Sequence, residues 1–254
     1  MNFLYTLRIL GILLMFFSTA QLFPASVAYY FQEYALIKVF FNTLLATFLC
    51  GFLLYILSAT RKEDLRTKDG FIITVLFWTV LSIFGSFPLI FAEEIDISYI
   101  DALFESISGL TTTGATVLTG LDELPRSILF YRQLLQWLGG MGIIVLAVAV
   151  LPLLGIGGMQ LYKAETPGPL KDSKLTPRIT ETAKALWYVY LTMTILCASA
   201  YKLFGMTTYD AICHAFSTVS IGGFSTHDES FGFFTQSSIR WTAVIFMIIA
   251  GINF

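Results

Sequence analysis

Two short segments of this chain combine hydroxyl side chains with glycine in a pattern that can hold a dehydrated cation. The segments are Thr111-Thr112-Thr113-Gly114 and Ser220-Ile221-Gly222-Gly223. β-Branched residues favour an extended backbone, and glycine permits unusual dihedral angles. Rings of backbone carbonyls replace the hydration shell of potassium in selective filters. We therefore take these eight residues as candidate potassium ligands, with the ion as transported substrate, and expect no cofactor.

The two segments belong to an internal repeat. Residues 101–116 align without a gap on residues 210–225, at an offset of 109. The matched pairs keep the residue type: Asp101/Asp210, Ala102/Ala211, Ser108/Ser217, Thr111/Ser220, Gly114/Gly223 and Thr116/Ser225. Small residues also let membrane helices pack closely, which is the alternative explanation. Packing alone does not require the same spacing from Asp to Gly twice, so the repeat favours a shared function.

Each copy of the repeat predicts a short helix followed by a loop. Residues 101–110 and 210–219 can form the helices, with an Asp at the N-terminus that suits both the cap and the helix dipole. Neither copy is long enough to cross a bilayer. Irregular backbone at membrane depth must be buried or line a watery cavity. The pattern therefore predicts two re-entrant pore loops.

The elements that would position these loops are membrane spans. The chain is 56% hydrophobic and only 13% charged, outside the balance of a soluble domain. Apolar blocks predict six spans, at about residues 3–23, 34–59, 71–91, 128–154, 185–204 and 239–254. We accordingly predict an all-α integral membrane protein with two helix, pore-loop, helix repeats preceded by two extra transmembrane helices.

Basic residues predict the orientation of the spans. Segments 61–70 and 155–184 hold nine of the fifteen lysines and arginines, which places both segments and the N-terminus in the cytoplasm. Eleven of the seventeen carboxylates then fall on the outer face, where they either concentrate cations or simply form a solvated loop surface. They are Glu33, Glu93, Glu94, Asp96, Asp101, Glu105, Asp122, Glu123, Asp210, Asp228 and Glu229.

The remaining polar residues suggest no catalysis or metal chemistry. The cysteines and the two histidines show no metal-ligand spacing, and we expect His214 to be a packing residue. Arg132 and Arg240 occupy nearly matching places after each loop and are expected to anchor helix ends. Residues 139–142 (GGMG) favour close helix approach, with a flexible gating point as the alternative. We predict that the chain is not an enzyme and binds no nucleic acid.

Several motifs resemble the TrkH/TrkG membrane subunits of Trk potassium-uptake systems, in the TrkH/KtrB superfamily. They are residues 110–116 (LTTTGAT), 136–142 (QWLGGMG), 157–162 (GGMQLY), 164–169 (AETPGP) and 220–227 (SIGGFSTH). The resemblance implies four pore repeats around one pathway, a homodimer and a cytosolic nucleotide-binding gating subunit of TrkA type. It also implies that residues 111–114 and 220–223 supply the carbonyls of the ion sites and that the bilayer is a bacterial inner membrane.

The expected organisation follows from the spans and this resemblance. Residues 1–60 form the N-terminal two-helix extension, 61–70 a cytoplasmic loop, 71–154 the first repeat, 155–184 a second cytoplasmic loop and 185–254 the second repeat, truncated in its last helix. Two repeats instead of four predict a fragment of a longer protein. The expected function is potassium transport through a gated filter; the alternative is a cation-coupled secondary carrier that uses the loops as coupling sites.

Overall fold

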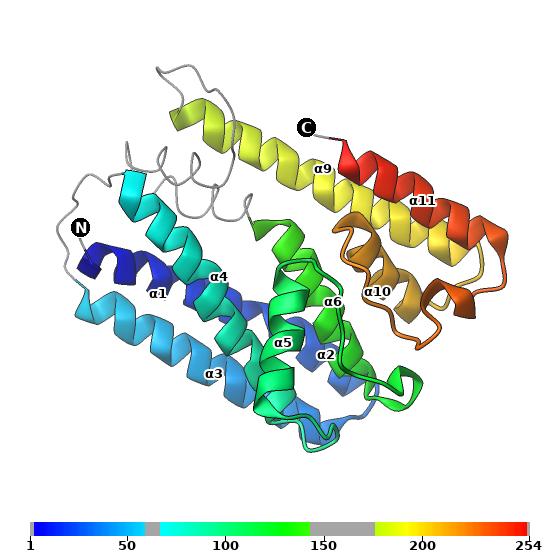
Figure 1. Ribbon diagram of the computed structural model, residues 1–254, viewed down its shortest axis with the longest axis horizontal. Helices are drawn as coiled ribbons and strands as arrows, with labels where there is room; N and C mark the ends of the chain where they lie inside the picture. The colour runs from blue at the N-terminus through cyan, green and yellow to red at the C-terminus, as the bar shows by residue number, and fades with distance from the viewer. Residues whose placement is uncertain (1–2, 59–66, 143–175, 253–254) are drawn as a thin grey trace. The chain divides into compact units, whose positions relative to one another are not determined.

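The computed structural model describes residues 3–58, 67–142 and 176–252, and every regular element in these ranges is helical (Figure 1). The α-helices are α1 (Phe3–Ala20), α2 (Leu22–Tyr30), α3 (Tyr34–Leu57), α4 (Thr67–Ile90), α5 (Tyr99–Leu110), α6 (Arg126–Gly140), α9 (Thr176–Leu203), α10 (Thr208–Val219) and α11 (Ser237–Gly251). Two short 3-10 helices, η1 (Leu121–Glu123) and η3 (Ser230–Phe233), lie in the loops. The all-α fold is confirmed.

Three segments among the described residues are long and apolar enough to cross a membrane: Thr6–Tyr30, Tyr34–Leu57 and Ile72–Ile90. Only 22% of the Tyr34–Leu57 window is buried although its mean hydropathy is 2.0, so most of this helix presents apolar side chains outward. Such a surface suits lipid. The first segment passes a turn at Gln21 and continues to Tyr30, beyond the expected end at residue 23.

The other expected spans agree with the structure in part. Helix α6 covers the start of expected span 128–154, and residues 143–154 lie outside the described part. Helix α9 covers residues 185–203 of span 185–204 but begins earlier, at Thr176. Helix α11 is apolar but shorter than a full span. Most of the two expected cytoplasmic loops, residues 61–66 and 155–175, also falls outside the described ranges.

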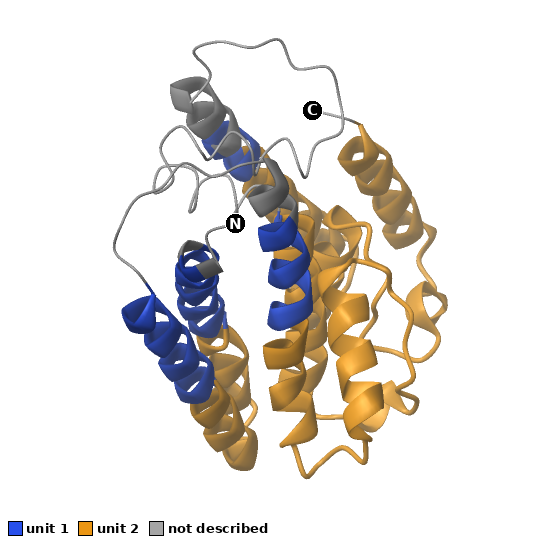
Figure 2. Cartoon of the chain, turned by 60° about the vertical axis from the view of Figure 1, so that its left-hand side comes forward, with its two compact units in different colours: residues 1–20, 44–81, 142–188 blue, residues 21–43, 82–141, 189–254 orange. Residues whose placement is uncertain are grey.

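The chain divides into two compact units, coloured separately in Figure 2. Unit 1 comprises residues 1–20, 44–81 and 142–188. Within it, α1 and α3 approach closely at two glycines, because a Cβ at Gly51 would lie 2.7 Å from the carbonyl oxygen of Gly11. Arg8 of α1 also donates to the hydroxyl of Tyr55 of α3 at 3.0 Å. Glycine pairs of this kind let membrane helices touch through their backbones.

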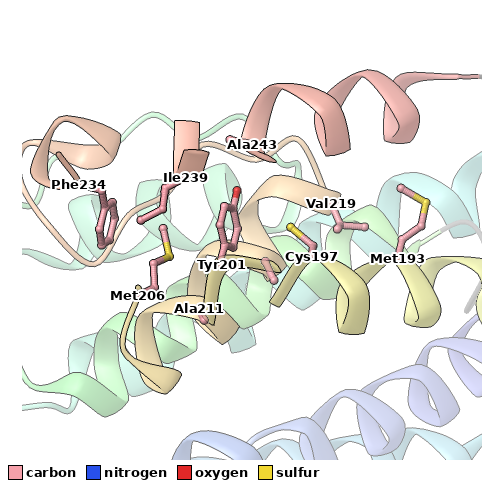
Figure 3. Close-up of a cluster of buried hydrophobic side chains, with 10 residues drawn as sticks. Met193, Cys197, Tyr201, Met206, Ala211, Val219, Phe234, Ile239 and Ala243 are labelled. Carbon is pink, nitrogen blue, oxygen red and sulfur yellow. The ribbon is translucent and has the colours of Figure 1, made fainter. Parts of the chain in front are cut away.

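Unit 2 comprises residues 21–43, 82–141 and 189–254 and contains both copies of the repeat. Helix α6 is its centre and contacts α2, α5 and α10, while α10 also contacts α11. A buried apolar cluster joins the last part of α9 to α10 and α11 (Figure 3). Its members are Met193, Cys197, Tyr201, Met206, Ala211, Ala215, Val219, Phe234, Ile239 and Ala243. This core holds the second copy of the repeat in place.

Candidate functional site

The short helix of each repeat begins earlier than predicted and has a different cap. Helices α5 and α10 start at Tyr99 and Thr208, and the caps are Ser98 and Thr207 rather than Asp101 and Asp210. Each cap oxygen accepts the Asp backbone N–H, at 3.2 and 3.0 Å. Each cap hydroxyl also donates to the Asp carboxylate, at 2.7 and 2.6 Å. The two aspartates thus support the caps from the first turn, where a negative charge suits the helix dipole.

Both helices end in the same hydrogen-bonded turn. The N–H of Thr113 donates to the carbonyl of Ser108 at 2.9 Å, and the N–H of Gly222 donates to the carbonyl of Ser217 at 2.8 Å. In both copies, the residue just before this donor also donates its N–H, and the acceptor is the carbonyl of the residue just after Ser108 or Ser217. This pair of bonds defines a Schellman motif, which reverses the chain at the end of a helix. The chain therefore leaves each short helix in the same way.

The backbone of the two loops repeats a left-handed pattern. Thr112 and Ile221 have φ of 53° and 55°, and Gly114 and Gly223 have φ of 74° and 89°. A left-handed conformation suits glycine, but it is a genuine outlier for a β-branched residue. Such strain costs on the order of 1–3 kcal/mol and is concentrated at ligand-binding sites. Its occurrence at aligned positions in both loops suggests a common requirement on the backbone rather than local accident.

The structure brings the two predicted loops together within unit 2. A Cβ at Gly114 would overlap the carbonyl oxygen of Gly222, and a Cβ at Gly223 would lie 4.0 Å from the Cα of Gly114. Thr111, Thr113, Ile221 and Gly223 are exposed, whereas Gly222 is buried. All eight predicted residues therefore belong to one region in which the backbones of the loops meet and part of each loop faces outward.

Helix α6 packs against the start of both loops. A Cβ at Gly139 would overlap the carbonyl of Leu110, and a Cβ at Gly140 would lie 2.9 Å from the Cβ of Ser220. The missing side chains of Gly139 and Gly140 thus leave room for the end of α5 and the start of the second loop. Close helix approach, the role expected for residues 139–142, is confirmed at these two positions.

Gln136 of α6 holds the second loop by hydrogen bonds. Its Oε1 accepts from the hydroxyl of Ser217 at 2.9 Å and from the backbone N–H of Phe224 at 3.1 Å, and the side chain is fully buried. A Cβ at Gly222 would overlap the same amide, at 2.5 Å from Oε1. One side chain therefore fixes both ends of the segment 217–224 and requires glycine at 222.

Replacing Gln136 with leucine should lower the thermal stability of the protein markedly. The hydroxyl of Ser217 and the N–H of Phe224 would lose their acceptor, at a cost of about 1–3 kcal/mol for each buried group left unpaired. Gln133 is a matched control on the same helix, because it is equally buried and neither of its amide atoms has a hydrogen-bond partner. Gln133→Leu should be neutral or stabilising. Thermal unfolding of both variants in detergent tests this, and equal midpoints would contradict it.

A buried ion pair lies behind the first loop. The Nε of Arg132 is 3.0 Å from a carboxylate oxygen of Glu105, and both side chains are almost fully buried. Glu105 also accepts from the hydroxyl of Thr116 and, at 2.7 Å, from the N–H of Val117. The guanidinium lies 4.3 Å from the ring centre of Phe224 in the second loop. The network thus connects α5 and α6 to both loops.

Two sequence-based expectations are wrong at this ion pair. Glu105 does not join the carboxylates of the outer face, and Arg132 does not anchor a helix end. Both are buried because α5 packs along α6, a tertiary contact that local spacing does not reveal. Arg240, expected to match Arg132, is exposed and donates to the carbonyl of Thr235 at 3.1 Å. It does fit the role of a helix-end anchor.

The second repeat has a hydrogen-bonded pair at the positions equivalent to Glu105 and Thr116. His214 aligns with Glu105, and Ser225 aligns with Thr116. The Nε2 of His214 lies 3.0 Å from the hydroxyl of Ser225, and its Nδ1 lies 2.9 Å from the carbonyl of Asp210. His214 is fully buried, so its expected packing role is confirmed, and it also braces the loop.

The segment between the first loop and α6 contacts the segment between the second loop and α11. The Nδ1 of His227 forms a short contact with a carboxylate oxygen of Asp122, and its ring stacks on Phe233 at 3.6 Å between centroids. The hydrogen bond from His227 lowers the pKa of Asp122. His227 Nε2 also lies 3.5 Å from the carboxylate of Asp210. These contacts join the segment before α6 to α10 and to the segment before α11.

The region of the two loops offers oxygen atoms rather than a cluster of metal-binding side chains. In the described ranges, no three His, Cys, Asp or Glu side chains are grouped so that they could hold a metal ion. The loops instead offer backbone carbonyls and hydroxyls beyond the C-terminal ends of α5 and α10, which carry partial negative charge.

The caps Ser98 and Thr207 could have been predicted from the sequence patterns Ser-x-x-Asp and Thr-x-x-Asp. Gln136, Glu105 and Arg132 had no comparable local pattern.

Comparisons with known proteins give a consistent result. Residues 36–254 match the family model TrkH, described as a cation transport protein. The chain is 57% identical over its whole length to the Trk system potassium uptake protein TrkH of Vibrio parahaemolyticus, and 52% identical to TrkH of Escherichia coli strain K12. In each case it covers 52% of the relative. The chain therefore spans about half the length of these relatives.

A solved structure is also similar. The crystal structure of the potassium transporter TrkH from Vibrio parahaemolyticus matches with a TM-score of 0.85 and 52% sequence identity. The match covers all of this chain and 51% of that one. At this identity the likeness extends to the sequence as well as to the arrangement of helices.

Proposed function

This chain belongs to the TrkH family of cation transport proteins, and from that premise we propose that residues 111–114 and 220–223 line a potassium-selective filter. The observation that carries the proposal is the duplicated backbone of the two loops. Both contain a Schellman turn, a left-handed β-branched residue and a left-handed glycine, at matching positions. A filter needs equivalent carbonyls from each repeat at equal depth, and equal backbones provide them.

The proposed filter stabilises an ion that has lost its water. Carbonyl dipoles and hydroxyls of the loops take the place of the hydration shell. Helices α5 and α10 both end where the loops begin, and each helix C-terminus carries about half of a negative elementary charge. The rigid support from Gln136 and from the pair Glu105–Arg132 would hold the carbonyls at a fixed spacing. Conduction through the filter is then passive.

The proposal also covers the transported ion, the assembly and the orientation of the protein in the membrane. The relatives are named as potassium uptake proteins of a Trk system, which supports potassium as the ion and a multicomponent assembly. We assign a homodimer in the bacterial inner membrane, with a cytoplasmic N-terminus and a cytosolic nucleotide-binding subunit of TrkA type that gates conduction. The basic residues of segments 61–70 and 155–184 support this orientation.

Flux without a coupling gradient tests the proposal against the carrier alternative. Full-length protein in liposomes should let rubidium move down its own gradient when no sodium or proton gradient is present. A coupled carrier would require one of those gradients. Gly223→Val should reduce the passive flux, since a left-handed β-branched residue would replace the glycine of the second loop. Rubidium movement that depends on a second gradient, or flux unchanged by this substitution, would refute the filter.

A further inference from the structure

A cavity of about 480 Å³ lies in unit 2, apart from the loops, where the ends of α2, α6 and α10 meet. Aromatic and aliphatic side chains form most of its wall, including Phe31, Phe130, Tyr209 and Ile212. The polar groups in the lining are Arg126 and several hydroxyls, among them Ser26 and Thr208. The cavity thus combines one cation with an apolar wall.

The guanidinium of Arg126 is held in place without an acidic partner. It lies over the rings of Phe31 and Tyr209, at 4.9 and 5.3 Å from the ring centres. Among the residues that the structure describes, no carboxylate lies within ion-pair distance of it. Aromatic stacking orients a guanidinium while leaving its N–H groups free to bind an oxyanion.

The acidic side chain that contacts the backbone of Arg126 is already engaged. The carboxylate of Glu33 accepts from the backbone N–H of Arg126 at 2.8 Å and from the N–H of Ser127 at 3.1 Å. It therefore caps the first turn of α6, where the dipole compensates its charge. The charge of the Arg126 side chain remains available for a ligand.

The rim of the cavity has the composition of a membrane interface. Tyr30, which lines the cavity, is 77% exposed, and its neighbour Tyr29 is 72% exposed. Both are at the end of the apolar segment Thr6–Tyr30. Ile212, which lines the cavity, is exposed as well, and so are Leu22 and Phe23 at the start of α2. Tyrosines at the end of a span mark the headgroup level, and exposed aliphatic side chains beside them suit acyl chains.

We propose that this cavity binds the phosphodiester of a glycerophospholipid, with Arg126 as the phosphate ligand. A guanidinium pairs with two phosphate oxygens at once, and the hydroxyl of Thr208 lines the same space. The exposed apolar rim favours a lipid over free inorganic phosphate, because the acyl chains would cover it. The bound lipid would join α2 to the N-terminal ends of α6 and α10.

Native mass spectrometry of the full-length protein in detergent tests the site. Dioleoylphosphatidylglycerol should bind, and Arg126→Gln should weaken the first bound lipid about ten-fold, since a charged hydrogen bond is lost. Arg240→Gln is the matched control: Arg240 is also exposed at the start of a helix but does not line the cavity, and its variant should bind as the wild type does. Ile212→Phe, which fills the cavity and keeps the charge, should also weaken binding and serves if Arg126→Gln does not fold.

Two further ligands identify the source of the phosphate. Dioleoylglycerol, which has the chains but no phosphate, should bind weakly and show no dependence on Arg126. Inorganic phosphate at equal concentration should not displace the phospholipid. Equal lipid binding by the wild type, Arg126→Gln and Ile212→Phe would overturn the proposal, and so would displacement by inorganic phosphate.

Discussion

Gly114→Ala is expected to reduce potassium uptake by the full-length protein to less than about one hundredth of the wild-type rate. Gly114 has φ of 74°, a conformation that costs alanine about 1–2 kcal/mol. The new methyl group would also overlap the carbonyl oxygen of Gly222 in the other loop. Because the obstacle is backbone rather than a flexible side chain, the two loops would have to move apart. Uptake in cells that lack other potassium transporters measures the effect.

Alanine substitutions at two other glycines separate the steric clash from the cost of a left-handed backbone. Gly120 has φ of 68° but nothing within 4 Å of its Cβ position, and it lies between the first loop and α6. Gly120→Ala should therefore leave uptake within about two-fold of the wild type while carrying the same left-handed penalty. Gly223→Ala, with φ of 89° and no contact closer than 4.0 Å, should be intermediate. Equal losses for Gly114→Ala and Gly120→Ala would contradict a contact between the loops.

The sequence was sufficient to predict the features that are local or repeated. The offset between Asp101 and Asp210 predicted both loops, and the structure reproduces it in the helix bounds of α5 and α10. Glycine at 139 and 140 predicted a close approach, since a missing Cβ is informative wherever it occurs. The sequence favoured Asp101 and Asp210 as helix caps over Ser98 and Thr207, because all of these residue types suit a helix N-terminus.

The features that depend on tertiary packing could not be predicted in this way. Glu105 is of a residue type that is usually exposed to solvent, and it is buried only because α5 lies against α6. The first apolar segment continues to Tyr30, beyond its expected end at residue 23, and Pro24 lies in the first turn of α2, where it loses no hydrogen bond. The burial of His214 was anticipated, but its bond to Ser225 was not.

The pair Glu105–Arg132 should show strong coupling in a double-mutant cycle. Glu105→Gln leaves a guanidinium buried without a counter-charge, and Arg132→Met leaves a buried carboxylate. Breaking a buried pair from one side costs about 3–5 kcal/mol, whereas replacing both partners with neutral groups costs much less. The double variant should therefore be more stable than either single variant, although it loses the contact of Arg132 with Phe224.

The second repeat gives a reason to expect that the neutral combination folds. At the position aligned with Glu105 it carries His214, and at the position aligned with Arg132 it carries Trp241, which is 65% exposed. Neither charge is present there, yet its loop has the same turn as the first. Thermal unfolding of the three variants in detergent, together with rubidium flux, measures the coupling. Additive losses of stability would mean that Glu105 and Arg132 act independently, and that the loop is held by the contacts to Thr116 and Val117 instead.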